Sequence, residues 1–210
     1  MITVYNVLMK SHPKNERTLV IIKPDGIQRT LIGEIIQRYE RLGLKLVGMK
    51  LVRPTKELVE KHYTNDPEWI RKTGAKFIAH ATEHKLNIKH PDPVKMGEHI
   101  LHRLSKYMTA GPVIAMVWQG LHVVPVVRKI TGGTEPLRSD VGTIRGDFVL
   151  DSYEFSDIQD RSIRNLVHAS GSVEEADKEI ALWFKKDELI DYTLVQEKIL
   201  YDMNLDGIFE

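Results

Sequence analysis

Two short and almost entirely apolar segments most constrain how this chain can fold. Residues 17–26, RTLVIIKPDG, hold four consecutive apolar residues and then the turn-forming triplet Pro24-Asp25-Gly26. Residues 111–120, GPVIAMVWQG, hold a second apolar run between two glycines. A short apolar run between turn signals is typical of a strand buried inside a sheet. Both segments are therefore predicted to be strands, the first of them ending in a turn.

Segments with a helical spacing of apolar residues alternate with these strands. Helices are predicted at 31–43, 55–63, 99–108 and 121–130, and an alternating strand at 44–54. A last strand is predicted over Asn165, Leu166 and Val167, followed by a helix from Ser172. Interleaved strands and helices with short connections favour an α+β fold. The prediction is a ferredoxin-like split β-α-β sandwich, with helices packed on an antiparallel four-stranded sheet.

Three stretches between these elements have the composition of loops. Residues 64–97 are expected to be an irregular excursion with one helical piece, and residues 151–162 a polar surface excursion. Residues 131–147 are predicted to be a Gly, Thr and Pro loop that carries Arg138 and Arg145. The predicted organisation is an N-terminal extension (1–16), one domain (17–192) with insertions at about 64–97 and 151–162, and a C-terminal tail (193–210).

Composition excludes several classes of protein. The 210 residues include no cysteine, which rules out disulfides, thiolate zinc sites and cysteine nucleophiles and fits a reducing cytoplasm. A net charge of +1 argues against a protein that coats nucleic acid or a membrane surface. No apolar run approaches the roughly 20 residues that span a bilayer. The strands are aliphatic and lack the exposed aromatics of an RNA-binding sheet. Neither a membrane nor a sequence-specific nucleic acid is expected as a partner.

The stretch RNLVHASGSVEEADKEI, residues 164–180, places a histidine just before a well-marked helix start. Ser172 and Glu175 form the S-x-x-E capping box. His168 therefore lies where a strand meets a helix N-terminus, a position that favours anions and phosphate above all. Glu179 lies about two turns into the helix, where it can point back under the imidazole. The alternative from these residues alone is a capped helix with a histidine in its leading turn.

Four further residues indicate phosphate binding. Lys23 stands at a strand end, Arg128 at the end of a helix, and Thr134 and Arg145 in the Gly-rich segment. Arginine offers phosphate a bidentate fork and lysine a point charge. None of these is specific alone. The chain has no G-x-x-x-x-G-K-[ST] loop and no H-R-D or D-F-G motif, so it is neither a P-loop enzyme nor a protein kinase.

Taken together and in order, the motifs closely resemble those of nucleoside diphosphate kinase. From about residue 17 to about residue 192 they are KPDGIQR, IGEIIQR, KHY, GPVIAMVWQG, GTIRGDF, and NLVHAS followed by GSVEEADKEI and ALWF. The resemblance implies a ping-pong transfer of the γ-phosphoryl group of a nucleoside triphosphate, typically ATP, to a nucleoside diphosphate. By the resemblance, His168 is the nucleophile, Glu179 the carboxylate that orients it, and Ser170 the hydroxyl that steadies that carboxylate.

The resemblance also implies the remaining site residues and partners. Lys23, Arg128, Thr134 and Arg145 match phosphate-contacting positions, Tyr63 the tyrosine near the phosphates, and Asn165 with Lys23 the pair that holds the ribose hydroxyl. Mg²⁺ would bridge the phosphate oxygens, and without a carboxylate cage it would arrive with the nucleotide, so no protein metal ligands are expected. The family forms homo-oligomers, commonly hexamers and sometimes tetramers or dimers.

The sequence departs from the family pattern near the histidine and in the excursion. Ala169 stands where the family usually has Gly, and Gly171 stands where it usually has an acidic residue. The aromatic that stacks on the base falls within 64–97, and Trp69 is the candidate, with Leu104 as its apolar companion. The alternative function is a catalytically impaired nucleotide-binding or assembly protein on the same fold.

Histidines outside the motifs are interpreted conservatively. His80 and His84 have the spacing of a helical metal pair, but a solvated, partly helical lid is the preferred interpretation. His62 and His122 are expected to be ordinary surface or packing residues.

Overall fold

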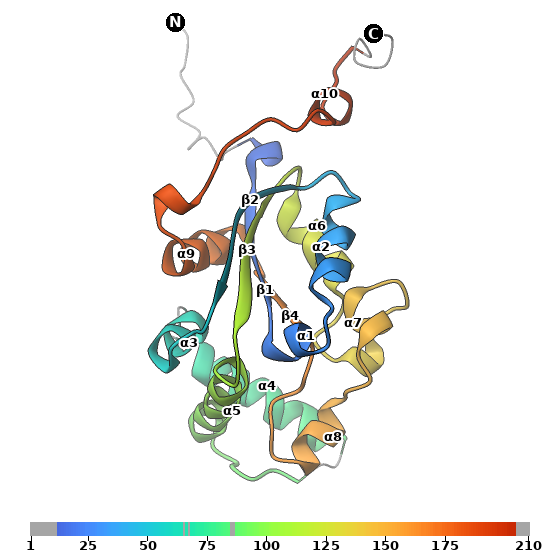
Figure 1. Ribbon diagram of the computed structural model, residues 1–210. Helices are drawn as coiled ribbons and strands as arrows, with labels where there is room; N and C mark the ends of the chain where they lie inside the picture. The colour runs from blue at the N-terminus through green and yellow to red at the C-terminus, as the bar shows by residue number, and fades with distance from the viewer. Residues whose placement is uncertain (1–11, 65, 67, 85–86, 205–210) are drawn as a thin grey trace, which may run out of the picture.

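The computed structural model describes residues 12–64, 66, 68–84 and 87–204, with a four-stranded antiparallel sheet at its centre (Figure 1). The strand order is β2-β3-β1-β4, with β1 at Arg17–Ile22, β2 at Lys45–Val52, β3 at Val113–Gln119 and β4 at Val167–Ala169. β1 pairs with β3 along its whole length, and β4 pairs with the other side of β1. The predicted ferredoxin-like α+β class is confirmed.

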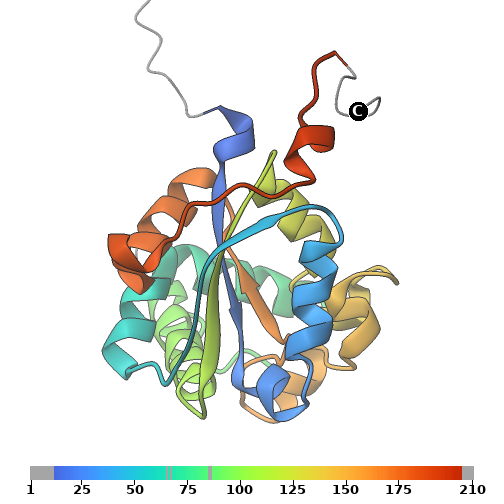
Figure 2. The same ribbon diagram turned by 45° about the horizontal axis from the view of Figure 1, so that its top comes forward.

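Helices cover both faces of this sheet (Figures 1 and 2). α2 (Ile32–Glu40) and α6 (Val123–Thr131) pack together on one face, and α3 (Lys56–Tyr63) and α9 (Val173–Trp183) pack together on the other. The central strands β1 and β3 are therefore buried along nearly their whole length. A strand that is covered on both faces needs apolar residues at consecutive positions, and this explains the two apolar runs.

Side-chain caps begin the two helices of the second face. Thr55 Oγ1 accepts a hydrogen bond from the backbone N–H of Leu58 at 3.2 Å, and Ser172 Oγ accepts one from that of Glu175 at 3.1 Å. Each bond satisfies an N–H group that has no partner inside its helix. Both predicted helix starts are confirmed.

The predicted turn at Pro24-Asp25-Gly26 is wrong. These residues begin a short helix, α1 (Pro24–Gln28), with Pro24 at its start. Proline suits a first helical position because its ring presets φ and its missing N–H would have had no partner there. Asp25 is held from outside, since Tyr107 Oη donates to its Oδ1 at 2.6 Å.

Within 64–97 the expected helical piece is confirmed, but the expectation that the rest is an irregular excursion is wrong. The described residues of this stretch form α4 (Trp69–Glu83) and the first turn of α5 (Pro93–Met108), and the two helices pack together below the sheet (Figure 1). They approach closely at two glycines. A Cβ on Gly74 would lie 1.8 Å from the carbonyl oxygen of Pro93, and one on Gly97 would lie 2.0 Å from that of Ile70. Glycine has a low intrinsic helix propensity. At these two positions the close packing of α4 against α5 leaves no room for a larger residue.

Short helices also replace part of the two predicted loops. Arg138 lies in a 3-10 turn, η2 (Pro136–Arg138), and Arg145 lies in α7 (Ile144–Phe148) and not in a loop. The excursion at 151–162 contains α8 (Tyr153–Ile158), capped by Ser152. The predicted loops therefore contain short helices.

The segment after α9 runs along β2 at the edge of the sheet. It contains the 3-10 turn η3 (Lys186–Glu188) and the short helix α10 (Glu197–Leu200). Near the other end of the chain, the 3-10 turn η1 (Pro13–Asn15) precedes β1. The backbone N–H of Ile190 donates to the Val47 carbonyl at 2.8 Å, and Tyr192 Oη donates to the Leu46 carbonyl at 2.9 Å. Most of the predicted extension 1–16 and the last residues of the predicted tail 193–210 lie outside the described residues.

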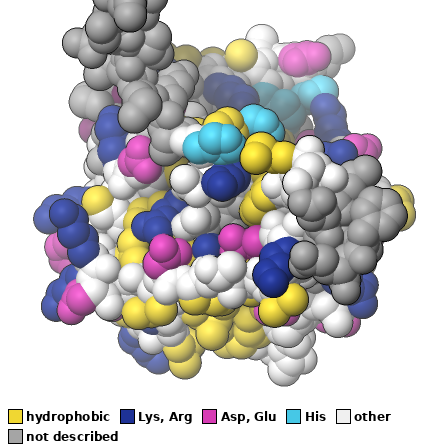
Figure 3. Space-filling model, turned by 90° about the horizontal axis from the view of Figure 1, so that it is seen from above, with side chains coloured by type: hydrophobic (Ala, Val, Ile, Leu, Met, Phe, Trp, Pro, Cys, Tyr) yellow, Lys and Arg dark blue, Asp and Glu magenta, His cyan; other side chains and the backbone are white. Residues whose placement is uncertain are grey.

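Charged side chains of both signs are distributed over the surface. On the face seen from above, Lys and Arg side chains alternate with Asp and Glu (Figure 3). That face therefore offers no continuous basic surface of the kind that binds nucleic acid backbones. Among the described residues, no helix combines the length and the apolar character needed to cross a membrane.

Replacing Gly97 by Ala tests the close approach of α4 and α5. We expect Gly97→Ala to lower the free energy of unfolding by about 1–3 kcal/mol, because the added methyl group forces the two backbones apart. Gly33→Ala in α2 is the matched control, because no atom would lie within 4 Å of its Cβ. The control should be stabilised by up to about 1 kcal/mol through helix propensity. Urea denaturation of both variants makes the measurement, and equal effects would contradict the expected packing.

Candidate active site

His168 is positioned by β4, and the backbone just before it is unusual. The residue pairs with Ile21 of β1, while Leu166 has φ 61°. The prediction of a strand over Asn165, Leu166 and Val167 is therefore wrong at its first two residues, because β4 begins at Val167. The left-handed region is unfavourable for a branched side chain and persists only where the surroundings enforce it. Here the buried Leu166 turns its carbonyl toward the backbone N–H of Lys23, which donates to it at 2.7 Å.

The imidazole of His168 lies against a buried carboxylate. His168 Nε2 is 3.0 Å from Glu179 Oε1 and 3.1 Å from Oε2. Ser170 Oγ donates to the same Oε2 at 2.6 Å. A carboxylate at Nε2 favours a proton on that nitrogen and leaves the lone pair on Nδ1. The structure thus brings together His168, Ser170 and Glu179, as predicted. His168 also borders a cavity, described below, from which a ligand could approach Nδ1.

Burial controls the charge of both partners. Burial, with the positive charge of Lys23 second, lowers the pKa of His168 to about 3. Burial raises the pKa of Glu179, against the opposing effects of His62 and the Ser170 hydrogen bond. A neutral imidazole is the nucleophilic form of histidine, and this environment keeps His168 in that form near neutral pH.

His62 also lies in this site, although the sequence predicted only an ordinary surface or packing residue. Its ring packs edge-on against that of His168 at 4.4 Å between centroids, and its Nδ1 accepts a hydrogen bond from Trp183 Nε1 at 3.2 Å. Burial lowers its pKa to about 3. The only sequence signal was its position beside Tyr63 in KHY. A packing role was expected, but the contact with the His168 ring could not be inferred from spacing.

Lys23 and Asn165 form the second polar group of the site. Lys23 Nζ donates to Asn165 Oδ1 at 2.7 Å, and Asn165 Nδ2 donates to the Thr134 carbonyl at 3.0 Å. Burial, with nearby Arg145 second, lowers the pKa of Lys23 to about 7. Lys23 is only 4% exposed, so an anion in the cavity would stabilise its charged form.

Arg145 uses most of its donors to hold backbone together. Its Nη1 donates to the carbonyls of Gly132 and Gly133 at 3.0 and 2.9 Å, and Nε and Nη2 donate to those of Asn165 and Val167 at 3.1 and 2.6 Å. Four of the five N–H groups of a guanidinium are thereby engaged. Arg145 joins the Gly-rich loop to the chain before His168, and one N–H stays available for a ligand.

Arg128 and Thr134 lie at the exposed part of the same cavity. Gly171 lies beside Arg128, and its backbone N–H donates to Glu175 Oε2 at 2.7 Å. A Cβ at Gly171 would lie 2.4 Å from that oxygen. Gly171 stands where an acidic residue was expected from the resemblance. In its place, the Glu175 carboxylate lies close to this position.

A single cavity of about 440 Å³ connects these groups. Part of its lining is apolar, and it includes both residues predicted to contact a base. The side chains of this part are Tyr63, Trp69, Phe77, Ile100, Leu104 and Ile163. The Tyr63 and Trp69 rings are 5.6 Å apart. Arg103, Ser156 and Asp157 add a polar edge there, which the sequence did not indicate.

Candidate metal ligands gather at one place among the described residues. His62, His168 and Glu179 offer ligand atoms within 4.8 Å of one another. Two nitrogens and one carboxylate suit Zn²⁺ better than Mg²⁺, which prefers oxygen ligands.

Comparison with known proteins gives a consistent result. The family model described as "Nucleoside diphosphate kinase" matches residues 16–77 and 78–189. The chain is 42% identical over 180 residues to a nucleoside diphosphate kinase of Pyrobaculum aerophilum, which covers 84% of this chain and 98% of that protein. It is 40% identical over 187 residues to nucleoside diphosphate kinase A of Homo sapiens, which covers 89% and 97% of the two chains.

Solved structures agree with the sequences. An NDP kinase from Pyrobaculum aerophilum superposes with a TM-score of 0.81 at 40% identity, covering 84% of this chain and all of that chain. A transition-state mimic of nucleoside-diphosphate kinase from Borrelia burgdorferi, with bound vanadate and ADP, superposes at 0.75 with 34% identity, covering 91% and 100%. The sheet and the covering helices are those of a phosphotransferase. The chain belongs to the nucleoside diphosphate kinase family.

The lowered pKa of His168 predicts that its reactivity persists in acid. An imidazole of ordinary pKa, about 6.5, is roughly 90% protonated at about pH 5.5 and loses most of its nucleophilic form. With a pKa of about 3, His168 stays neutral there. We therefore expect the single-turnover rate of protein phosphorylation by saturating ATP to change less than about twofold between about pH 8 and about pH 5.5. Rapid-quench measurement of labelled protein tests this, and a tenfold loss at the acid end would contradict it.

Proposed function

We propose that the protein carries out its family's reaction through His168. Nδ1 attacks the γ-phosphorus of a bound nucleoside triphosphate, the bond from that phosphorus to the β,γ-bridging oxygen breaks, and a nucleoside diphosphate leaves. A terminal oxygen of a second nucleoside diphosphate then attacks the phosphohistidine, and Nδ1 regains its lone pair. The observation that carries this proposal is the neutral, carboxylate-held imidazole that borders a cavity supplied with cationic side chains.

The other residues are proposed to position the phosphates and the sugar. Transfer of a phosphoryl group depends mainly on alignment and charge stabilisation. Lys23, Arg128 and the free N–H of Arg145 supply positive charge, with Thr134 and Tyr63 beside them. Asn165 and Lys23 hold the ribose hydroxyl, and Trp69 with Leu104 contacts the base. Their common cavity and their polar contacts support this assignment.

Magnesium is proposed to enter with the nucleotide. The described residues offer it no set of several oxygen ligands, and the one compact group of candidate ligands includes the proposed nucleophile. Mg²⁺ commonly binds phosphate oxygens together with water. When bound there, it would neutralise part of the phosphate charge, and the chain's own task is to align the phosphates with Nδ1.

A phosphoenzyme trap tests the proposed function. We expect label from γ-labelled ATP and magnesium to appear on the protein, to be acid-labile and base-stable, and to move to a different nucleoside diphosphate when that is added. His168→Ala should bind nucleotide but take up no label, because it lacks the nucleophilic nitrogen. The exposed His122→Ala is the control and should behave like the parent. Bound nucleotide without label on the parent protein would favour the alternative, a catalytically impaired binding or assembly protein.

We also propose that the protein forms a homo-oligomer through its sheet edge. The edge strand β2 exposes Met49 by 52% and Leu51 by 66%, and an exposed apolar strand edge favours pairing with another copy. We expect Leu51→Glu to shift sedimentation velocity toward smaller species. Leu137→Glu, at a 70% exposed residue elsewhere, should leave the distribution unchanged. Sedimentation of the parent as a monomer would contradict the proposal.

A further inference from the structure

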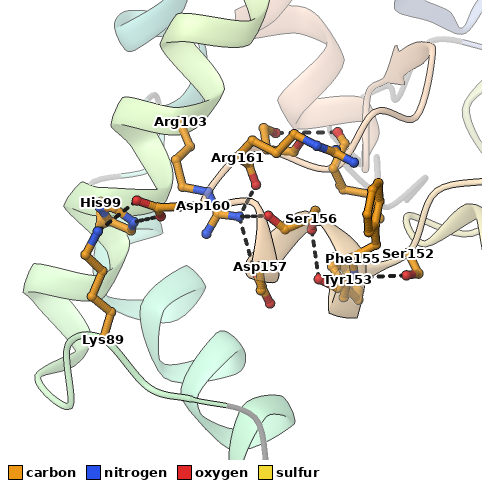
Figure 4. A network of polar contacts seen from close by, with 12 residues as sticks. Lys89, His99, Arg103, Ser152, Tyr153, Phe155, Ser156, Asp157, Asp160 and Arg161 are labelled. Carbon is orange, nitrogen blue, oxygen red and sulfur yellow. Dashed lines mark hydrogen bonds and ion pairs between the residues drawn. The ribbon is translucent and has the colours of Figure 1, made fainter.

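The insertion at 151–162 is held between α5 and the Gly-rich loop. On one side, Arg103 of α5 donates from Nη2 to Asp157 Oδ1 of α8 at 2.9 Å (Figure 4). On the other side, the backbone N–H of Tyr153, at the start of α8, donates to Glu135 Oε1 at 2.9 Å. Both contacts are made by partly buried groups. The first residue of α8 is therefore fixed beside the Gly-rich loop.

The side chain of Tyr153 lines the cavity of the candidate active site. Its ring packs edge-on against that of His80, with 5.2 Å between centroids, and its hydroxyl shares a hydrogen bond with the side chain of Thr134. Burial, with Glu135 second, raises the pKa of Tyr153 against the opposing effects of Arg145 and this hydrogen bond. The hydroxyl therefore keeps its proton near neutral pH and is available as a hydrogen-bond donor.

Thr134 is an exposed residue of the same cavity. Its backbone is fixed, because its carbonyl accepts a hydrogen bond from Asn165 Nδ2 at 3.0 Å, but an exposed hydroxyl can otherwise rotate to suit its surroundings. A threonine hydroxyl has one hydrogen, and deprotonated phosphate oxygens only accept. A hydrogen bond donated by Tyr153 to Thr134 Oγ1 therefore leaves the single hydroxyl hydrogen of Thr134 available for a phosphate.

We propose that Tyr153 is a positioning residue for phosphoryl transfer, an inference that rests on the proposed function. It donates to Thr134 Oγ1 and thereby directs the Thr134 hydrogen toward a phosphate oxygen of the bound nucleotide. Phosphoryl transfer depends mainly on alignment and charge stabilisation, so a donor that is oriented before the nucleotide binds raises the rate. The insertion at 151–162 thus acts on the reaction through a single hydroxyl group that does not touch the reacting atoms.

Removal of the hydroxyl alone tests this role. Tyr153→Phe keeps the ring against His80 and loses only the hydrogen bond to Thr134. We expect the single-turnover rate of protein phosphorylation by saturating ATP and magnesium to fall about three- to tenfold, the size expected for the loss of one neutral hydrogen bond. In a Thr134→Val background, the same change should alter the rate by less than about twofold, because the residue through which Tyr153 acts is already gone. Rapid-quench measurement of labelled protein gives all four rates.

Phe155→Leu is the matched control for Tyr153→Phe. Phe155 belongs to the same helix, but it is 53% exposed, and its ring centroid lies 5.1 Å from Cζ of Arg161. The change alters an aromatic ring of α8 outside the hydrogen bond between Tyr153 and Thr134, so the rate should stay within about twofold of the parental rate. A loss equal to that of Tyr153→Phe would show that the packing of α8, and not the hydroxyl, sets the rate, and would overturn the proposal.

The outcomes separate this inference from the proposed function. An unchanged rate in Tyr153→Phe would overturn the inference alone. Additive losses in the double variant would show that Tyr153 acts without Thr134 and would also overturn it, as would a parental rate in Thr134→Val. Failure of the parent protein to take up label while it binds nucleotide would instead overturn the proposed function, and this inference with it.

Discussion

The short pairing between β1 and β4 places the chemistry of the whole site. Ser170 Oγ accepts the Leu19 N–H at 3.1 Å, and the Ser170 N–H donates to the Leu19 carbonyl at 3.2 Å. At the other end of the pairing, Lys23 is bonded to the carbonyl of Leu166. Because β1 is buried in the centre of the sheet, it gives β4 a rigid support. Lys23 and His168, which are far apart in sequence, thereby line the same cavity.

The site combines several buried polar groups that would be costly without partners. Glu179 is satisfied by Ser170 and His168, and Arg145 by four backbone carbonyls. Lys23 has the amide oxygen of Asn165, which is a partner without charge, and burial lowers its pKa for that reason. A phosphate group would supply the missing negative charge. Ser170 and Glu179, beside His168, thus have hydrogen-bond partners within the protein. Among the described residues, the hydrogen bonds of Lys23 include no negatively charged partner, and a bound anion would supply one.

The helices α4, α5 and α8 contribute side chains to the same cavity as His168. These helices add apolar side chains and the Arg103–Asp157 ion pair to the lining of that cavity. Gly74 and Gly97 allow α4 and α5 to approach closely enough to form one wall.

The sequence alone determined the sheet, the main helix starts and the motif set, because these depend on local signals. The apolar runs at β1 and β3 require burial on both faces, and the caps at Thr55 and Ser172 satisfy N–H groups within three residues. The order of the motifs then indicated the family.

Only the tertiary structure decided features that depend on residues distant in the chain. The sequence predicted one helical piece within 64–97, but the close approach of Gly74 in α4 to Pro93 in α5 could be seen only in the fold. His62 became part of the site only through contact with His168, and Asp157 only through Arg103, 54 positions away. Burial and the missing partner of a polar atom arise from packing of the whole chain, and no local pattern of residues encodes them.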